Sequence, residues 1–220
     1  MFEFLTPPFV IAILLALSFH EWAHGYAAFR LGDPTAKYEG RLTLNPIAHL
    51  DPIGTLLFLT VGFGWGKPVP INPRYFRHYH RDTAIVSLAG PASNLVLAII
   101  SFGLIAVFIP NGLSAQEVQF PASAGPFLPF LHELLMTSLI VNLVLMAFNL
   151  LPIAPLDGSK ILAAFIPLKF SDQYEDFMRF GPFILLGLLI LGRSAGFDPL
   201  STWIHMIINP IMALLFSLAA

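Results

Sequence analysis

Long apolar stretches separated by polar, Pro/Gly-rich connections dominate the hydrophobic pattern of the chain. The first apolar stretch starts with Thr6 as a helix N-cap and Pro7 at the first helical position. It continues to Leu31, where Gly32-Asp33-Pro34 ends it. A helix of about 25 residues is long enough to cross a bilayer. The pattern therefore predicts a membrane-spanning helix at 7–31.

Later apolar segments predict further helices at 83–109, 131–148, 159–166, 181–191 and 199–218. We expect Asp82 to cap the helix at 83–109 and Gly90-Pro91 to kink it, because proline frees a backbone carbonyl. Residues 149–158 hold two prolines and a glycine, which regular helix excludes, so the span is predicted to be broken there. The fold class is an all-α polytopic membrane protein with about five to six transmembrane segments.

The polar connection 32–82 contains one segment of different character, residues 54–66. It is apolar, rich in aromatic and β-branched residues and in glycine, and too short to span a membrane. These features predict a short re-entrant or interfacial β-ribbon. The alternative is an ordinary hydrophobic loop packed on the helices.

Composition agrees with a membrane protein. The 220 residues are 56% hydrophobic and only 11% charged, whereas soluble domains carry about 25% charged residues. The net charge of −2 gives no indication of nucleic-acid binding, and the absence of cysteine excludes disulfides and thiol chemistry. We expect one integral membrane domain over 1–220, with a three-helix core at 7–168 and supporting helices at 177–220.

The distribution of Lys and Arg predicts the orientation in the membrane. Seven of these residues lie in 30–82 and none in 110–133. Because cytoplasmic connections carry the excess of positive charge, 32–82 should be cytoplasmic, as should 158–178. The N-terminus and the 110–130 loop should lie on the other side. His49, His78 and His80 belong to the basic connection, where a solvated surface is the expected environment.

The first apolar helix carries the pattern His-Glu-x-x-His at 20–24. Residues four apart lie on one helix face, so His20 and His24 can bind one metal ion, with Glu21 placed to take a proton from water at the metal. A charged residue inside a membrane helix costs about 2.5–3.5 kcal/mol and usually serves a function. A chance match to the pattern is the alternative.

Three polar sites are predicted at the same depth. Counting from the cytoplasmic helix ends, the two histidines lie about 10–16 Å deep, and Asn94 and Asp157 each about 16 Å deep. Two imidazoles and one carboxylate leave one tetrahedral position open, which is the pattern of a catalytic zinc site. The active site is therefore expected in the cytoplasmic half of the bilayer, with His20, His24 and Asp157 as zinc ligands.

The motif at 20–24, followed by Asn-x-x-Pro-x-x-x-Leu-Asp-Gly at 149–158, resembles the site-2 protease family of intramembrane zinc metalloproteases. Gly-Pro-x-x-Asn at 90–94 is similar to the intervening helix of that family, and the resemblance covers 7–168. It implies one zinc per chain held by the two histidines and the aspartate, with Glu21 activating water. It also implies a role in substrate handling for Asn149. The 110–130 loop is too short for a PDZ domain, so a compact member is indicated.

The expected reaction is hydrolysis of peptide bonds in or near transmembrane helices of membrane-protein substrates. Asn94 and Asn149 are candidates for substrate binding or for stabilising the oxyanion; alternatively, they only tie helices together. A rival class is a non-proteolytic zinc-binding membrane protein such as a metal transporter. A transporter would require ionisable residues through the full membrane depth. The last two helices, however, lack acidic residues in their interiors. A third class, a scaffold without activity, is disfavoured by the intact Glu21.

Overall fold

The computed structural model describes residues 5–62, 64–109, 111–113, 118, 120–194 and 198–219. The α-helices are α1 (Pro7–Arg30), α2 (Thr35–Tyr38), α3 (Pro52–Val61), α4 (Tyr79–Phe108), α5 (Phe127–Asn149), α6 (Asp157–Ala163), α7 (Ser171–Met178), α8 (Gly181–Ser194) and α9 (Pro199–Ala219). Short 3₁₀ turns are η1 (Pro46–His49), η2 (Pro73–Tyr75), η3 (Ala122–Ala124) and η4 (Leu168–Phe170). Among the described residues, α1, α4, α5 and α9 are long and apolar enough to cross a membrane. The chain is thus an all-α, multi-pass membrane protein.

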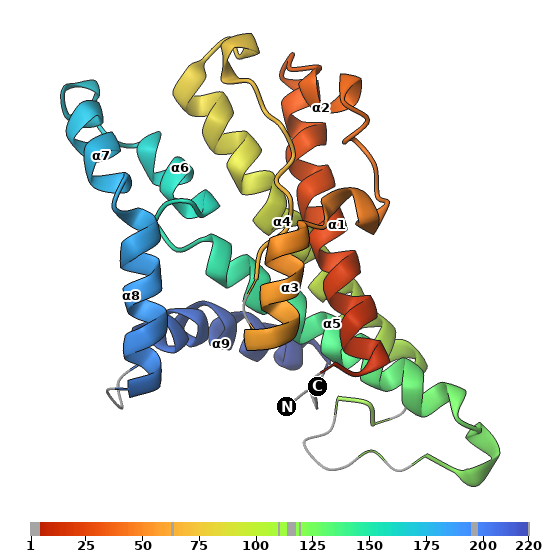
Figure 1. Cartoon of the computed structure of the whole chain (residues 1–220). Coiled ribbons are helices and arrows are strands. Elements are labelled where there is room, and N and C mark those ends of the chain that lie inside the picture. The colour runs from red at the N-terminus through yellow and green to blue at the C-terminus, as the bar shows by residue number, and fades with distance from the viewer. Residues whose placement is uncertain are drawn as a thin grey trace.

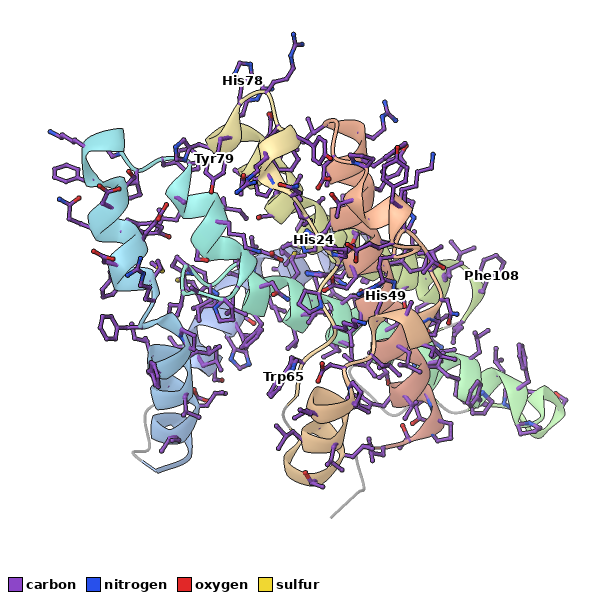
Figure 2. All side chains as sticks on the ribbon, turned by 45° about the horizontal axis from the view of Figure 1, so that its top comes forward. His24, His49, Trp65, His78, Tyr79 and Phe108 are labelled. Carbon is purple, nitrogen blue, oxygen red and sulfur yellow. The ribbon has the colours of Figure 1, made fainter. Side chains whose placement is uncertain are left out.

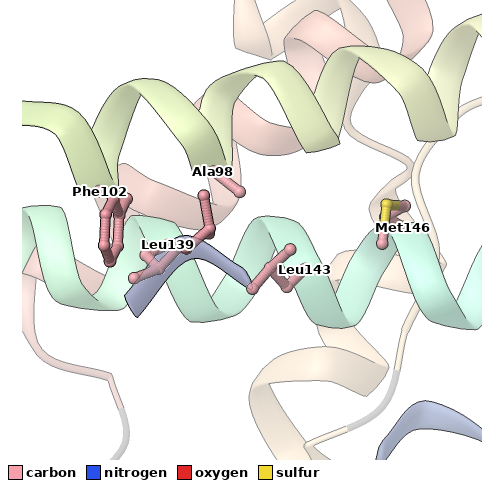
Figure 3. Packing of buried hydrophobic residues seen from close by; sticks show 6 residues of the cluster. Ala98, Phe102, Leu139, Leu143 and Met146 are labelled. Carbon is pink, nitrogen blue, oxygen red and sulfur yellow. The ribbon is translucent and has the colours of Figure 1, made fainter. Parts of the chain in front are cut away.

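Helices α1, α4 and α5 pack against one another and form the centre of the molecule (Figure 1). Between α4 and α5, Ala98 and Phe102 meet Leu139, Leu143 and Met146 in a buried apolar cluster (Figure 3). Buried positions of α1 are mostly small, including alanines and a serine, and small side chains let membrane helices approach closely. This close approach brings the polar residues of the three helices within reach of one another.

The two ends of the bundle carry different connections. In Figure 1 the end of α1, the start of α4, and helices α6 and α7 lie at one end, and the start of α5 lies at the other. The ends of both connections predicted to be cytoplasmic therefore lie on the same side, while α3, within the 32–82 connection, extends beside the first half of α1. Apolar side chains cover the outer face of α4, as a lipid-facing surface requires; the exposed ones include Val96, Ile99, Ile100, Val107 and Phe108.

The first helix matches the prediction, and the second begins earlier than predicted. The hydroxyl of Thr6 accepts a hydrogen bond from the N–H of Phe9, and α1 ends at Arg30. Helix α4 starts at Tyr79, so Asp82 lies inside its first turn and is not the N-cap. The buried Asp82 carboxylate accepts hydrogen bonds from the N–H of His78 and from Arg81, and this backward pairing adds a turn to the helix. Helix α4 runs unbroken through Pro91.

The β-ribbon predicted at 54–66 is wrong: residues 52–61 form helix α3, and no β-strand is found in the part of the chain that the structure describes. The start and end signals of a helix are present. Asp51 caps it by accepting the N–H of Gly54 at 2.8 Å, Pro52 occupies the first position, and Gly62 ends it with φ +77°. Phe63 lies outside the described residues.

Helix α3 lies beside the first half of α1 (Figure 1), with the rings of Phe9 and Phe58 stacked at 6.1 Å. Gly54 is needed for a close approach, since a Cβ there would meet the backbone of Trp65. Within the described residues, an isolated antiparallel bridge joins Leu50 to Gly66. The segment is thus a short helix followed by extended chain.

The broken span at 149–158 is confirmed. Helix α5 ends at Asn149 and α6 begins at Asp157, with turns between them. Leu151 and Leu156 in this break are buried against Leu185 of α8, which fixes the path of the chain. Gly158 is required because a Cβ there would meet the carbonyl oxygens of Leu150 and Leu151. The start of α6 is therefore held tightly against the end of α5.

Candidate metal centre

Three side chains from two separate helices converge in the interior. His20 and His24 of α1 and Asp157 of α6 are 4%, 6% and 6% exposed. The two Nε2 atoms lie 3.0 Å apart, and Oδ2 of Asp157 lies 3.2 Å from Nε2 of His20 and 3.1 Å from Nε2 of His24. The structure therefore brings together, on one point, the three residues predicted as zinc ligands.

The remaining ring nitrogens determine what the histidines present to that point. His24 Nδ1 lies 2.7 Å from the carbonyl oxygen of Val86, and His20 Nδ1 lies 2.7 Å from Oδ1 of Asn94. Because a carbonyl oxygen can only accept, each Nδ1 must carry the proton. In the neutral imidazoles, Nε2 is then an unprotonated acceptor facing the centre.

These three acceptor atoms fit a zinc ion. A tetrahedral zinc with bonds of about 2.0–2.2 Å places its ligand atoms about 3.3–3.6 Å apart, a few tenths of an ångström more than the observed 3.0–3.2 Å. Two lone pairs and a carboxylate facing one another in a buried site are unfavourable without a cation between them. Each histidine also has the hydrogen-bond partner on its second nitrogen that metal-bound histidines usually have.

Gly90 lies directly against this group, a role that neither the predicted kink nor the Gly-Pro-x-x-Asn pattern assigned to it. A Cβ at this position would meet Nε2 of His24 and the ring of His20. Glycine here lets the backbone of α4 approach the imidazoles where any side chain would fill the centre. The sequence contains a signal for this contact: glycine inside a helix lowers its stability, so a glycine next to a proline in an apolar helix indicates a specific packing role.

Glu21 lies outside the three-residue group. Its Oε2 accepts a hydrogen bond of 2.7 Å from the backbone N–H of Val69. Val69 belongs to an extended segment, residues 64–72, which we call the strap. Thus the side chain predicted as the general base is oriented by the backbone of a segment that follows α3.

The strap is fixed by the connection around it. Lys67 N–H donates to the carbonyl of His49 at 2.8 Å, and Asn72 N–H donates to Asp33 Oδ2 at 2.6 Å. Nη2 of Arg41 donates to the carbonyls of Lys67 and Pro68 at 2.8 and 3.2 Å. All these strap groups belong to its backbone, so the strap is positioned largely irrespective of its own side chains.

The expectation that His49 lies on a solvated surface is wrong. His49 is 1% exposed, next to α1, and its Nε2–H donates to the carbonyl of Thr43 at 2.8 Å (Figure 2). Asp33 and Arg41 are buried with it, at 1% and 9% exposure. The polar composition of the connection predicted a solvated surface, but Asp33 and Arg41 bind backbone groups of the strap, and His49 binds a backbone group elsewhere in the connection.

The two candidate asparagines have different environments. Asn94 is fully buried, with its oxygen on His20 and its Nδ2 donating to Ala16 O at 3.2 Å and to Asn142 Oδ1 at 2.9 Å. Asn149 is partly buried, and its Nδ2 donates to Leu145 O in its own helix at 3.0 Å. The structure therefore brings Asn94 to the histidines, whereas the hydrogen bond of Asn149 stays within its own helix.

A cavity of about 390 Å³ lies beside α6, between it, the start of α4 and α7. Lys160 lines this cavity, and its ammonium lies 4.0 Å from Oδ1 of Asp157, the oxygen that does not face the histidines. Tyr174 of α7 donates its hydroxyl to the carbonyl of Ser159 at 2.6 Å, and burial raises the pKa of this tyrosine. The cavity thus reaches the residues next to Asp157.

Comparison with known proteins decides the family. Over 217 residues, 94% of this chain and 95% of the relative, the sequence is 38% identical to "Putative zinc metalloprotease YwhC" of Bacillus subtilis (strain 168). The chain belongs to the site-2 protease family. Within this family it is also 33% identical over 183 residues to "Putative zinc metalloprotease Rip2" of Mycolicibacterium smegmatis, covering 80% of the chain and 64% of that relative. No family model and no solved structure matches the chain.

Proposed function

We propose that this site-2 protease family member is an intramembrane zinc metalloprotease that hydrolyses peptide bonds in or near transmembrane helices of membrane proteins. The observation that carries the proposal is the buried convergence of His20, His24 and Asp157 within an all-α membrane fold. The names of the relatives, zinc metalloproteases, support the same reaction.

In this proposal His20, His24 and Asp157 hold one zinc ion per chain. A bound zinc supplies Lewis-acid chemistry and lowers the pKa of water toward neutrality. Glu21 takes the proton from the attacking water and later delivers it to the leaving amine. Its Oε2 is held by the N–H of Val69, and we assign the proton transfer to Oε1. The Val69 bond restricts the rotation of the carboxylate and so orients this second oxygen.

We propose that 7–168 is the catalytic core and that 177–220 supports it within one domain, 1–220. Contacts of α8 and α9 support this division. Leu185 of α8 packs against the break between α5 and α6, and Trp203 of α9 donates its indole N–H to Ala147 O at 2.8 Å. Both contacts stabilise the end of α5, from which the chain leads to Asp157.

The test is a comparison of Glu21→Gln and His20→Ala in purified protein reconstituted with a transmembrane substrate. Glu21→Gln should keep zinc but lose about 10²–10⁴ in cleavage rate, the usual effect of removing a general base. His20→Ala should lose zinc as well. Glu39→Gln, at an exposed glutamate of the 32–78 connection, is the matched control. Cleavage by Glu21→Gln at the wild-type rate would assign the base to another residue.

We propose that the metal centre lies in the cytoplasmic half of the bilayer, supported by the excess of Lys and Arg at 30–82. The protein has no cysteine, so single cysteines report the side directly. Arg77 precedes the start of α4 and Ser123 precedes the start of α5, and both are exposed, so Arg77→Cys and Ser123→Cys test the two ends of the bundle. An impermeant thiol reagent added outside intact cells should label position 123 and not 77. Labelling of both from outside contradicts this orientation.

A further inference from the structure

A buried chain of polar side chains leads away from His20 into the three-helix core. Asn94 of α4 bonds to His20, Asn142 of α5 bonds to Asn94, and Asn142 Nδ2 donates to the carbonyl of Ser138 at 2.8 Å. Asn94 and Asn142 are 0% and 1% exposed. Neither the zinc-ligand assignment nor the mechanism above uses Asn142.

The hydrogen bonds allow one orientation of each amide. Ser138 O can only accept, so the NH₂ group of Asn142 points to it and Oδ1 of Asn142 points to Asn94. Asn94 must then direct its NH₂ group to this oxygen and to the carbonyl of Ala16. Its own oxygen faces Nδ1 of His20, which must carry a proton.

Without this constraint, the Nε2–H tautomer of metal-free His20 would be favoured. Its Nε2 lies 3.2 Å from Oδ2 of Asp157, so a proton on Nε2 would form a hydrogen bond to a buried carboxylate. That proton would occupy the position of a metal ion and would have to be displaced on binding. A group that keeps the proton on Nδ1 therefore keeps Nε2 ready for a ligand.

We propose that Asn142 is a positioning residue that acts through Asn94 to hold His20 in the Nδ1–H tautomer and so prepares the metal centre. Asn142 supplies the shorter of the two bonds that orient the Asn94 amide, 2.9 Å against 3.2 Å from Ala16 O. His24 provides an internal reference. Its Nδ1–H donates to the backbone carbonyl of Val86, which no side-chain substitution on α5 removes.

The inference rests on the proposed zinc function only for its consequence in metal binding, since the tautomer is a property of the metal-free protein. Loss of a hydrogen-bond partner of a metal-bound histidine typically lowers metal affinity or activity about 10–100-fold. Asn142→Leu and Asn142→Ala remove all hydrogen bonds of the amide, to Asn94 and to the carbonyl and hydroxyl of Ser138. Asn142→Asp, buried as a neutral acid, keeps an O–H donor for Ser138 O and a carbonyl acceptor for Asn94.

Ser138→Ala is the matched control. It lies one turn from Asn142 in the same helix, and its side chain forms longer bonds of 3.3 Å to Asn142 and 3.0 Å to Ser101. The acceptor that orients Asn142 is the backbone carbonyl of Ser138, which the substitution retains. This variant perturbs the same buried polar chain without releasing the amide of Asn142.

The experiment is ¹⁵N NMR of the imidazoles in the full-length, metal-free protein, together with zinc affinity by chelator competition. In the wild type, His20 and His24 should both show the Nδ1–H tautomer. Asn142→Leu and Asn142→Ala should move His20 toward Nε2–H, leave His24 unchanged, and weaken zinc binding about 10–100-fold. Asn142→Asp and Ser138→Ala should resemble the wild type.

Two outcomes overturn the inference: unchanged His20 signals in either apolar variant, or the same loss of zinc affinity in Ser138→Ala as in Asn142→Ala. The unchanged His24 signals show that a variant is folded, and Asn142→Ala repeats the test of Asn142→Leu without added bulk. Failure of the proposed proteolysis would appear differently. Zinc binding and tautomers would then follow the expected pattern while no variant, including the wild type, cleaved any transmembrane substrate.

Discussion

The candidate zinc ligands are held by helices, whereas the proposed base is held by extended chain. His20, His24 and Asp157 lie at 4–6% exposure, with partners supplied by α1, α4 and α6. Glu21, one residue from His20 on the same helix, binds instead to the strap, at Val69 N–H. Metal binding and proton transfer therefore depend on two different parts of the chain, although their residues are neighbours in sequence.

This difference indicates that the two functions can be disturbed separately. In the helical part, a buried polar atom that loses its partner costs about 1–3 kcal/mol or more, because no water replaces the bond. The strap is held by several hydrogen bonds to its backbone, so the loss of one should shift Glu21 without abolishing its function. Variants of the first kind should lose zinc, and variants of the second kind should keep zinc and cleave more slowly.

The largest effect is expected for Gly90→Ala. The new methyl group would meet Nε2 of His24 and the ring of His20, so we expect loss of stoichiometric zinc and of cleavage. Gly103→Ala is the matched control on the same helix, since a Cβ there meets nothing within 4 Å. Replacing glycine by alanine inside a helix should otherwise stabilise by about 0.5–1 kcal/mol. Elemental analysis measures the zinc content of the two variants, and thermal unfolding measures their stability. Zinc retained in Gly90→Ala would show that the imidazoles can move aside.

The helical part of the site could be predicted from the sequence because its geometry is local. The spacing of His20 and His24 fixes a common helix face, and the break at 149–158 marks where Asp157 enters. Asn142 is itself a signal in the sequence, since a polar residue within an apolar helix usually has a specific partner. Its partner on α4 could not be identified, because the packing of α4 on α5 is tertiary information.

The strap and α3 could not be placed in the same way. Composition suggested a ribbon at 54–66, although Asp51-Pro52 and Gly62 are the start and end signals of a helix. The buried side chains of Asp33 and Arg41 bind backbone groups tens of residues away, the N–H of Asn72 and the carbonyl of Lys67. Polar side chains that bind distant backbone show no periodicity, so they resemble a solvated loop in sequence.

An intermediate effect is expected for Arg41→Met. Arg41 donates to the carbonyls of Lys67 and Pro68, the two residues that precede Val69. Its loss should make the strap more mobile and so weaken the positioning of the Glu21 carboxylate. Hydrogen bonds to charged groups contribute about 1.5–3 kcal/mol, and a misplacement costing about 1.4 kcal/mol in the transition state slows cleavage about tenfold.

Zinc content measured beside the cleavage rate distinguishes this effect from damage to the metal centre. Arg74→Met, at an exposed arginine in the same connection, should leave both quantities unchanged. If Arg41→Met loses zinc together with activity, the strap and the metal centre are one cooperative unit and the separation described above is wrong.

The smallest effect is expected for Lys67→Ala, which tests whether the strap is held by its backbone. The side chain of Lys67 is exposed, whereas its N–H donates to His49 O at 2.8 Å and its carbonyl accepts from Arg41. If the strap is positioned by its backbone, removing the side chain should change stability by less than about 0.5 kcal/mol and leave cleavage unaffected. Lys67→Pro removes the donor N–H at the same position, so it should slow cleavage while zinc remains bound. The cleavage rates of Lys67→Ala and Lys67→Pro, each at full zinc content, measure the contribution of the Lys67 N–H. Equal rates would mean that its bond to His49 does not help to hold Glu21.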